Sequence, residues 1–110
     1  MIDWQRVACL RAEIGEDDFA EVVALFLEEV DEALDRLNGA TTPAASEAAL
    51  HFLKGSALNI GFVDFAAICH AGEREAAAGK AVDARAISAR YRASRQEFLG
   101  KHPPGRKPSG

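Results

Sequence analysis

A histidine, a lysine and a glycine lie within five residues of one another, at His51, Lys54 and Gly55. In a helix, residues three and four positions apart are neighbours on the surface, so the lysine and the glycine both lie beside the imidazole. Histidine side chains in general titrate with a pKa of about 6.5, so a neutral imidazole that can act as a nucleophile is available at physiological pH. The lysine would offset the charge of a phosphoryl group, about −1.5 to −2 in phosphoesters. These residue types indicate that His51 accepts a phosphoryl group.

Gly55 strengthens this interpretation because glycine inside a helix costs about 1 kcal/mol relative to alanine. Its bare backbone beside His51 would leave space for the phosphoryl group and for the loops of a partner protein. Close packing against a neighbouring helix is the alternative explanation. However, Gly55 lies away from the apolar face of its helix. That face consists of Leu50, Leu53, Ala57 and Ile60, which recur at helical spacing.

Two further residues that can do chemistry follow in the next segment, at His70 and Glu73. Antiparallel packing of the two helices would bring both side chains near His51. A carboxylate that accepts the proton of one ring nitrogen fixes the tautomer and makes the other nitrogen the better nucleophile. The alternative is a solvated helix surface on which Glu73 pairs with Arg74 or Lys80.

Four other residues have a possible role near the histidine. We expect Leu58 and Phe62, near the exposed histidine face or the end of its helix, to form an apolar patch on which a partner docks. Partial burial in the bundle is the open alternative for both. Leu25, which is surrounded by glutamates, either belongs to a partner patch or is covered by the first helix. Ser56 lies at the flank of the apolar face and is expected to support helix packing.

No segment shows the alternating pattern of a strand, and the glycines and prolines fall between helical blocks. Short loops between long amphipathic helices imply antiparallel neighbours. The expected fold is therefore all-α, an antiparallel up-and-down four-helix bundle with a short additional N-terminal helix. The expected helices run from Asp3 to Gly15, from Asp17 or Asp18 to about Leu37, from Thr42-Pro43 to Gly61, from Asp64 to near Gly79, and from Asp83 onward.

The bulk properties of the 110 residues restrict the classes of partner. We expect one bundle domain over residues 1–100 and a flexible tail over residues 101–110, which are rich in proline and glycine. The net charge of −4 argues against nucleic acid or an anionic membrane as the main partner. Cys9 and Cys69 are expected to be small buried hydrophobic residues. No apolar run approaches the roughly 18 residues of a membrane span, which favours a cytoplasmic protein, with a monomer as the default state.

The segment from His51 to Gly61 resembles the active-site helix of histidine-containing phosphotransfer (HPt) domains. The pattern of that helix is His-x-Leu-Lys-Gly-Ser/Ala-Ser/Ala-x-x-hydrophobic-Gly. The resemblance extends over roughly residues 3 to 99 and implies a four-helix-bundle phosphocarrier that is not itself an enzyme. The matching residues are His51, Leu53, Lys54, Gly55, Ser56, Ala57, Ile60 and Gly61.

The same resemblance implies partners and roles. His51 would accept a phosphoryl group from an aspartate on the receiver domain of a hybrid sensor histidine kinase or a response regulator, and pass it to another receiver. Mg²⁺ and the acidic catalytic residues would belong to the partner. In the related module of chemotaxis histidine kinases, a glutamate at the separation of Glu73 holds the phospho-accepting imidazole, and a second histidine lies at the separation of His70.

Two rival functions remain to be weighed. A phosphate-independent adaptor could bind receiver or kinase domains through the bundle, but an adaptor does not need histidine, lysine and glycine in this register. A metal site could use His51, His70 and Glu73 as ligands. Lys54 would repel a cation there, and the sequence shows neither a His-x-x-x-His nor a Cys-x-x-Cys spacing. We therefore expect no metal on this chain.

Overall fold

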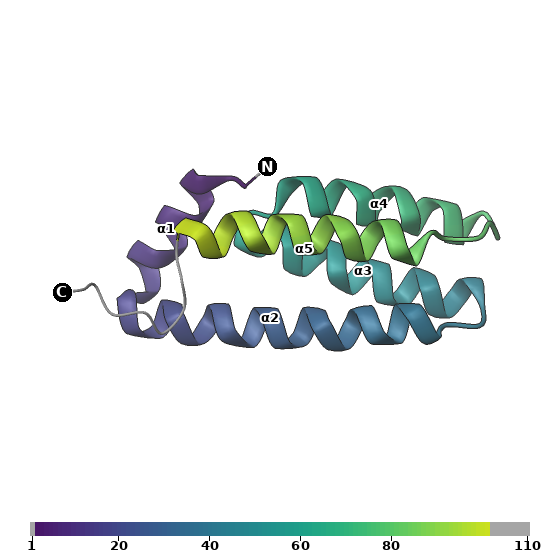
Figure 1. Ribbon diagram of the computed structural model, residues 1–110, viewed down its shortest axis with the longest axis horizontal. Coiled ribbons are helices and arrows are strands. Elements are labelled where there is room, and N and C mark those ends of the chain that lie inside the picture. The colour runs from purple at the N-terminus through teal and green to yellow at the C-terminus, as the bar shows by residue number, and fades with distance from the viewer. Residues whose placement is uncertain (1, 102–110) are drawn as a thin grey trace.

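Five α-helices follow one another along residues 2–101, the part of the chain that the computed structural model describes (Figure 1). The predicted all-α fold is confirmed, and the only β-type pairing among these residues is an isolated bridge between Ile2 and Phe62. The predicted tail over residues 101–110 lies outside the described residues, apart from Lys101. The helices are α1 (Trp4–Ile14), α2 (Glu16–Gly39), α3 (Pro43–Ile60), α4 (Val63–Ala77) and α5 (Ala84–Lys101).

Three helices begin where they were predicted to, each after a residue whose side-chain oxygen accepts a hydrogen bond from a backbone N–H of the first turn. Asp3 caps α1, Thr42 caps α3 and Asp83 caps α5, each at 3.1 Å. Gly61 closes α3 in the left-handed conformation, with φ of 87°. This conformation suits glycine because it carries no Cβ.

Two helices begin slightly earlier than predicted. α2 begins at Glu16, directly after Gly15, so that Asp17 and Asp18 lie inside its first turn, where carboxylates interact favourably with the helix dipole. α4 begins at Val63 with Phe62 as its N-cap residue, and Asp64 lies in its first turn. The turn between α3 and α4 is thus shorter than predicted. Its backbone closes through hydrogen bonds from Phe62 N to Ala57 O and from Val63 N to Gly61 O.

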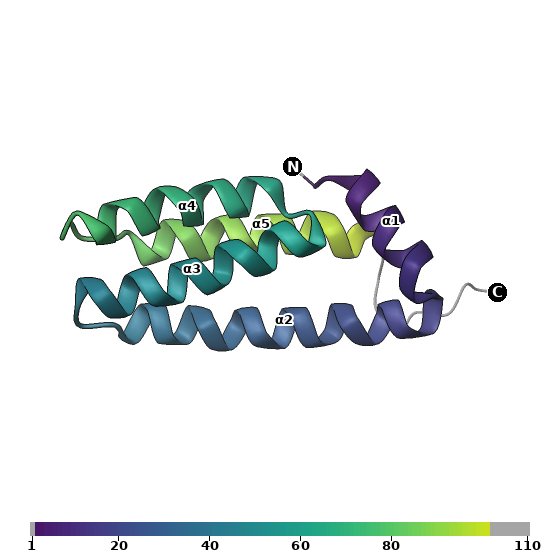
Figure 2. The ribbon, with the colours of Figure 1, turned by 180° about the vertical axis from the view of Figure 1, so that it is seen from behind.

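The four long helices α2 to α5 run alternately up and down in a bundle that measures 51 × 21 × 19 Å with α1 included (Figure 1). α3 packs against both α2 and α4, and α5 lies against α4 and α2. α1 lies across the end of the bundle where α2 begins and where α3 and α5 end (Figure 2). The chain before α1 is held to the α3–α4 turn by the hydrogen bond from Asp3 N to Gly61 O, at 2.7 Å.

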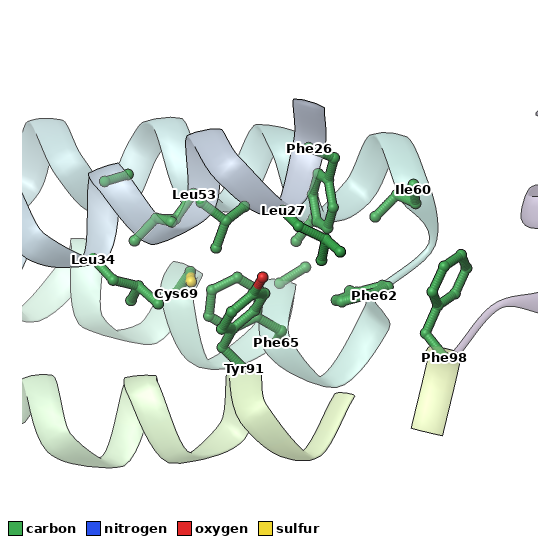
Figure 3. Close-up of a cluster of buried hydrophobic side chains, with 14 of the residues drawn as sticks. Phe26, Leu27, Leu34, Leu53, Ile60, Phe62, Phe65, Cys69, Tyr91 and Phe98 are labelled. Atoms are coloured by element: carbon green, nitrogen blue, oxygen red, sulfur yellow. The ribbon is translucent and has the colours of Figure 1, made fainter. Parts of the chain in front are cut away.

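Aromatic side chains fill the core at the same end of the bundle (Figure 3). The Phe62 ring lies 5.1 Å from that of Phe26, 5.5 Å from that of Phe98 and 6.4 Å from that of Tyr91. Phe62 is completely buried, because the left-handed turn at Gly61 directs the next residue into the bundle. The prediction that Phe62 belongs to an exposed docking patch was therefore wrong.

The two cysteines have different environments. Cys69 is buried as predicted, and desolvation, with the nearby Glu73 charge, raises the pKa of its thiol to about 12. The prediction for Cys9 was wrong, because Cys9 is exposed. It lies on the outer side of α1, a helix in which Val7 is the only buried residue. Within residues 2–101, no helix is long and apolar enough to cross a membrane.

Candidate functional site

The orientation of His51 follows from the packing of α3. The apolar residues Leu50, Leu53, Ala57 and Ile60 are each at most 2% exposed and hold one side of the helix against the core. This fixes the rotation of α3 about its axis, and His51 points to the opposite side. Its side chain is 72% exposed, so a ring nitrogen is accessible to another protein.

Close packing between α3 and α4 brings a carboxylate to the imidazole. Gly72 on α4 lies against Leu50 on α3: a Cβ placed on Gly72 would come within 3.2 Å of a Leu50 methyl carbon. The next residue on each helix, Glu73 and His51, then meet at the surface, where His51 Nδ1 lies 2.9 Å from Glu73 Oε2. The expected proximity of Glu73 to His51 is confirmed. Glycine at position 72 therefore permits the helix approach that creates this contact.

The second oxygen of the same carboxylate pairs with the lysine. Lys54 Nζ lies 2.7 Å from Glu73 Oε1, and the two side chains are 24% and 17% exposed. Glu73 thus joins His51 and Lys54, one oxygen to each. Lys54 lies beside the histidine as predicted, but its ion pair with Glu73 was not predicted. The shared helix face of His51 and Lys54 was the available signal, since a carboxylate that reaches one of them is close to both.

The electrostatics of this cluster determine which ring nitrogen carries the proton. The Lys54 ammonium is the main cause that lowers the pKa of Glu73, and His51 lowers it further, while partial burial acts in the opposite direction. Glu73 is therefore ionised at neutral pH and can only accept hydrogen bonds. The Nδ1–H group of His51 must be the donor. In the neutral imidazole, Nε2 then carries the free lone pair and is the nucleophilic nitrogen.

Gly55 faces open space. Apart from its own helix backbone and chain neighbours, a Cβ placed on it would meet no atom of residues 2–101 within 4 Å, in contrast to a Cβ on Gly72. Close packing against a neighbouring helix, the alternative explanation for this glycine, is therefore excluded within residues 2–101. The absent side chain leaves room on the outside of the protein, next to His51.

The remaining predicted site residues lie outside this group of hydrogen-bonded and ion-paired side chains. His70 is exposed on α4, and no hydrogen bond or ion pair joins it to another residue in the range 2–101. Ser56 is half-buried on the α2 side of α3. Leu58 is 58% exposed, two turns of α3 beyond His51, and Leu25 on α2 is exposed to the same extent. α1 thus does not cover Leu25.

An open groove of about 450 Å³, which was not predicted from the sequence, lies between α1, α2 and α3. Arg6 on α1 forms part of its wall and donates from Nε to the backbone oxygen of Asn59, at 3.0 Å. No short-range pattern indicates this contact, because the two residues are 53 positions apart. The other residues that line the groove are Leu10, Val22, Leu25, Phe26, Glu29, Ser56 and Ile60.

Among the described residues, no group of three or more His, Cys, Asp or Glu side chains could hold a metal ion. A comparison with protein-family models matches residues 21–97 to the Hpt domain. The matched segment contains α3 and α4 with the whole cluster of His51, Lys54 and Glu73. The chain matches no curated protein and no solved structure.

Proposed function

The chain belongs to the Hpt domain family, and on this basis we propose that His51 is its phospho-accepting residue. Hpt domains are phosphocarriers of phosphorelays and not catalytic enzymes, and they interact with receiver domains. In our proposal, His51 receives a phosphoryl group from the aspartyl phosphate of one receiver domain and passes it to an aspartate of another. The observation that carries this proposal is the exposed imidazole held through Nδ1 by an ionised carboxylate.

The transfer forms one bond and breaks one. The Nε2 lone pair of His51 attacks phosphorus, the N–P bond forms, and the P–O bond to the receiver aspartate breaks and leaves a carboxylate. The imidazole keeps its Nδ1 proton and gains positive charge as the N–P bond forms. Glu73, 2.9 Å from Nδ1, stabilises this charge. Transfer to the second receiver reverses these steps.

Lys54 and Gly55 make the site suitable for a phosphoryl group. Lys54 places a cation one helical turn from His51, where it can offset the negative charge that arrives. Gly55 leaves open space on the partner's side. The reaction also needs a divalent cation to neutralise the phosphoryl oxygens, and we expect Mg²⁺ on the receiver domain, not on this chain.

The test is phosphotransfer from a panel of receiver domains that have been phosphorylated with radiolabelled phosphate. Label should appear on this protein as an acid-labile, base-stable adduct, and His51→Gln should abolish it. His70→Gln is the matched control, since it removes an exposed histidine from the neighbouring helix and should still be labelled. The proposal would be wrong if the wild-type protein were labelled no more than His51→Gln by every receiver in the panel.

The same variant distinguishes the phosphocarrier from a phosphate-independent adaptor. An adaptor depends on the surface of the bundle and not on a nucleophile. His51→Gln would then retain full activity in a signalling assay, whereas the proposed phosphocarrier loses it.

A further inference from the structure

An exposed leucine on α2 is surrounded by negative charge. Leu25 is 58% exposed and borders the groove between α1, α2 and α3. Residues four before it and three, four and seven after it are its neighbours on the helix surface. All four are exposed, and none makes an ion pair with another residue in the range 2–101. These residues are Glu21, Glu28, Glu29 and Glu32.

This region lies close enough to His51 to be covered by the same partner. Ser56 and Asn59, in the wall of the groove, are five and eight residues after His51, or roughly 7 to 12 Å along the helix axis. A stable interface buries about 800 Å² on each protein, which corresponds to a patch roughly 30 Å across. On the α4 side of His51, the surface carries His70, Glu73 and Arg74, with Val63 41% exposed at the start of the helix. On the α2 side, the exposed Val22 and Leu25 border the groove, so exposed apolar side chains and a groove occur together there.

We propose that Leu25 and the surrounding glutamates determine which receiver domain this protein accepts. The selected receiver presents an apolar side chain that enters the groove beside Leu25, bordered by lysines or arginines that face the glutamates. Unpaired carboxylates repel a receiver whose docking face is acidic. A receiver with a neutral docking face would remove water from these carboxylates without offering them a partner. A basic border around an apolar contact satisfies both requirements. This proposal rests on the phosphocarrier function proposed above.

Of the four glutamates around Leu25, only Glu29 lines the groove itself. Glu29 is the acidic residue of the groove lining, which also includes Arg6, held by its bond to Asn59. A lysine or arginine of the partner that pairs with Glu29 must therefore be placed away from the fixed Arg6 side chain. Because the contact forms before phosphoryl transfer, its loss should weaken binding without changing the chemical step.

The experiment uses the receiver domain that labels His51 fastest in the panel described above, with quenched-flow measurement of transfer at increasing receiver concentrations. Leu25→Ala should raise the half-saturating receiver concentration about fivefold or more, the effect of a central interface residue. Glu29→Lys should raise it about tenfold at low salt, with a smaller ratio at high ionic strength. The rate at saturating receiver should not change for either variant. Glu75→Lys makes the same charge change on the exposed surface of α4 and should behave as wild type.

Each outcome has a defined meaning. If both variants show the half-saturating concentration of the wild-type protein, the docking proposal is overturned while the phosphocarrier function stands. If Glu75→Lys raises the half-saturating receiver concentration as much as Glu29→Lys does, only the net charge matters, and the docking proposal is also overturned. If exchange of a receiver lysine or arginine for glutamate restores transfer to Glu29→Lys, the paired contact is established. If no receiver labels His51, both proposals fail together.

Discussion

The two sides of α3 have been shaped by different requirements. Leu50 is completely buried and His51, the next residue, is 72% exposed. The buried side consists of apolar residues that contact α2 and α4, and it accounts for stability. The outer side carries His51, Gly55 and Leu58, which contribute little to the core. One helix can thus hold a reactive group firmly while the group itself remains free of the packing.

The largest difference should appear when adjacent residues on these two sides are changed. Leu50→Ala removes a fully buried side chain and should lower the free energy of unfolding by about 2 to 5 kcal/mol. His51→Gln should change it by no more than about 0.5 kcal/mol while it abolishes phosphorylation. Urea unfolding followed by circular dichroism measures both. A His51→Gln variant as unstable as Leu50→Ala would show that the two sides are not separate.

Much of the buried side could be predicted from the sequence, because helical periodicity and capping residues are local properties. The caps at Asp3 and Asp83, the start of α3 at Thr42-Pro43 and the apolar face of α3 are as expected. The errors lie where tertiary packing decides. Phe62 is directed inward by the turn at Gly61, and Cys9 is left exposed because α1 packs with few of its residues.

The candidate site could be predicted only in part. The spacing of Glu73 suggested that it reaches His51, and the contact is present. The ion pair of Glu73 with Lys54 depends on how closely α3 and α4 approach, which follows from the contact of Gly72 with Leu50. The groove was not predictable, because its walls come from three helices that are distant in the sequence.

The next largest effect should come from Glu73, the residue of α4 that holds His51 on the outer side of α3. Glu73→Gln keeps a similar shape and an acceptor oxygen but removes the charge that stabilises His51 during transfer. A hydrogen bond to a charged group contributes about 1.5 to 3 kcal/mol, so phosphorylation by a receiver should slow roughly 10- to 100-fold. Single-turnover kinetics measure this rate. The control Glu75→Gln lies two residues further along α4 on the exposed surface and should be phosphorylated at the wild-type rate. If Glu73→Gln were also phosphorylated at the wild-type rate, the proposed role of Glu73 would be ruled out.

The charge of Lys54 should be visible in the titration of Glu73. Because Lys54 is the main cause of the lowered pKa of Glu73, Lys54→Met should raise that pKa toward its ordinary value. A carboxyl group whose pKa is lowered in the folded state stabilises the protein at pH values above its unfolded-state pKa of about 4.3. This stabilisation is lost as the pH falls through the folded-state pKa. The stability difference between the wild-type protein and Glu73→Gln should therefore decrease below pH of about 4. An NMR titration of the Glu73 carboxyl carbon tests the first statement, and an unchanged midpoint in Lys54→Met would contradict it.

The smallest effect concerns two glycines: Gly55 on the outer side of α3, and Gly72 on α4, which packs against the buried side of α3 at Leu50. Gly55→Ala should raise the free energy of unfolding by about 0.5 to 1 kcal/mol, because the helix gains a better former and the new Cβ meets open space. Gly72→Ala should lower it, since its Cβ would press on Leu50 and Ile87, at 3.2 and 3.3 Å. The same Gly55→Ala variant should be labelled more slowly by a receiver, because the space it fills belongs to the partner. Thermal unfolding and phosphotransfer rates measured on one sample test both statements. If Gly55→Ala gained stability without any loss of rate, the open space at Gly55 would have no role in docking.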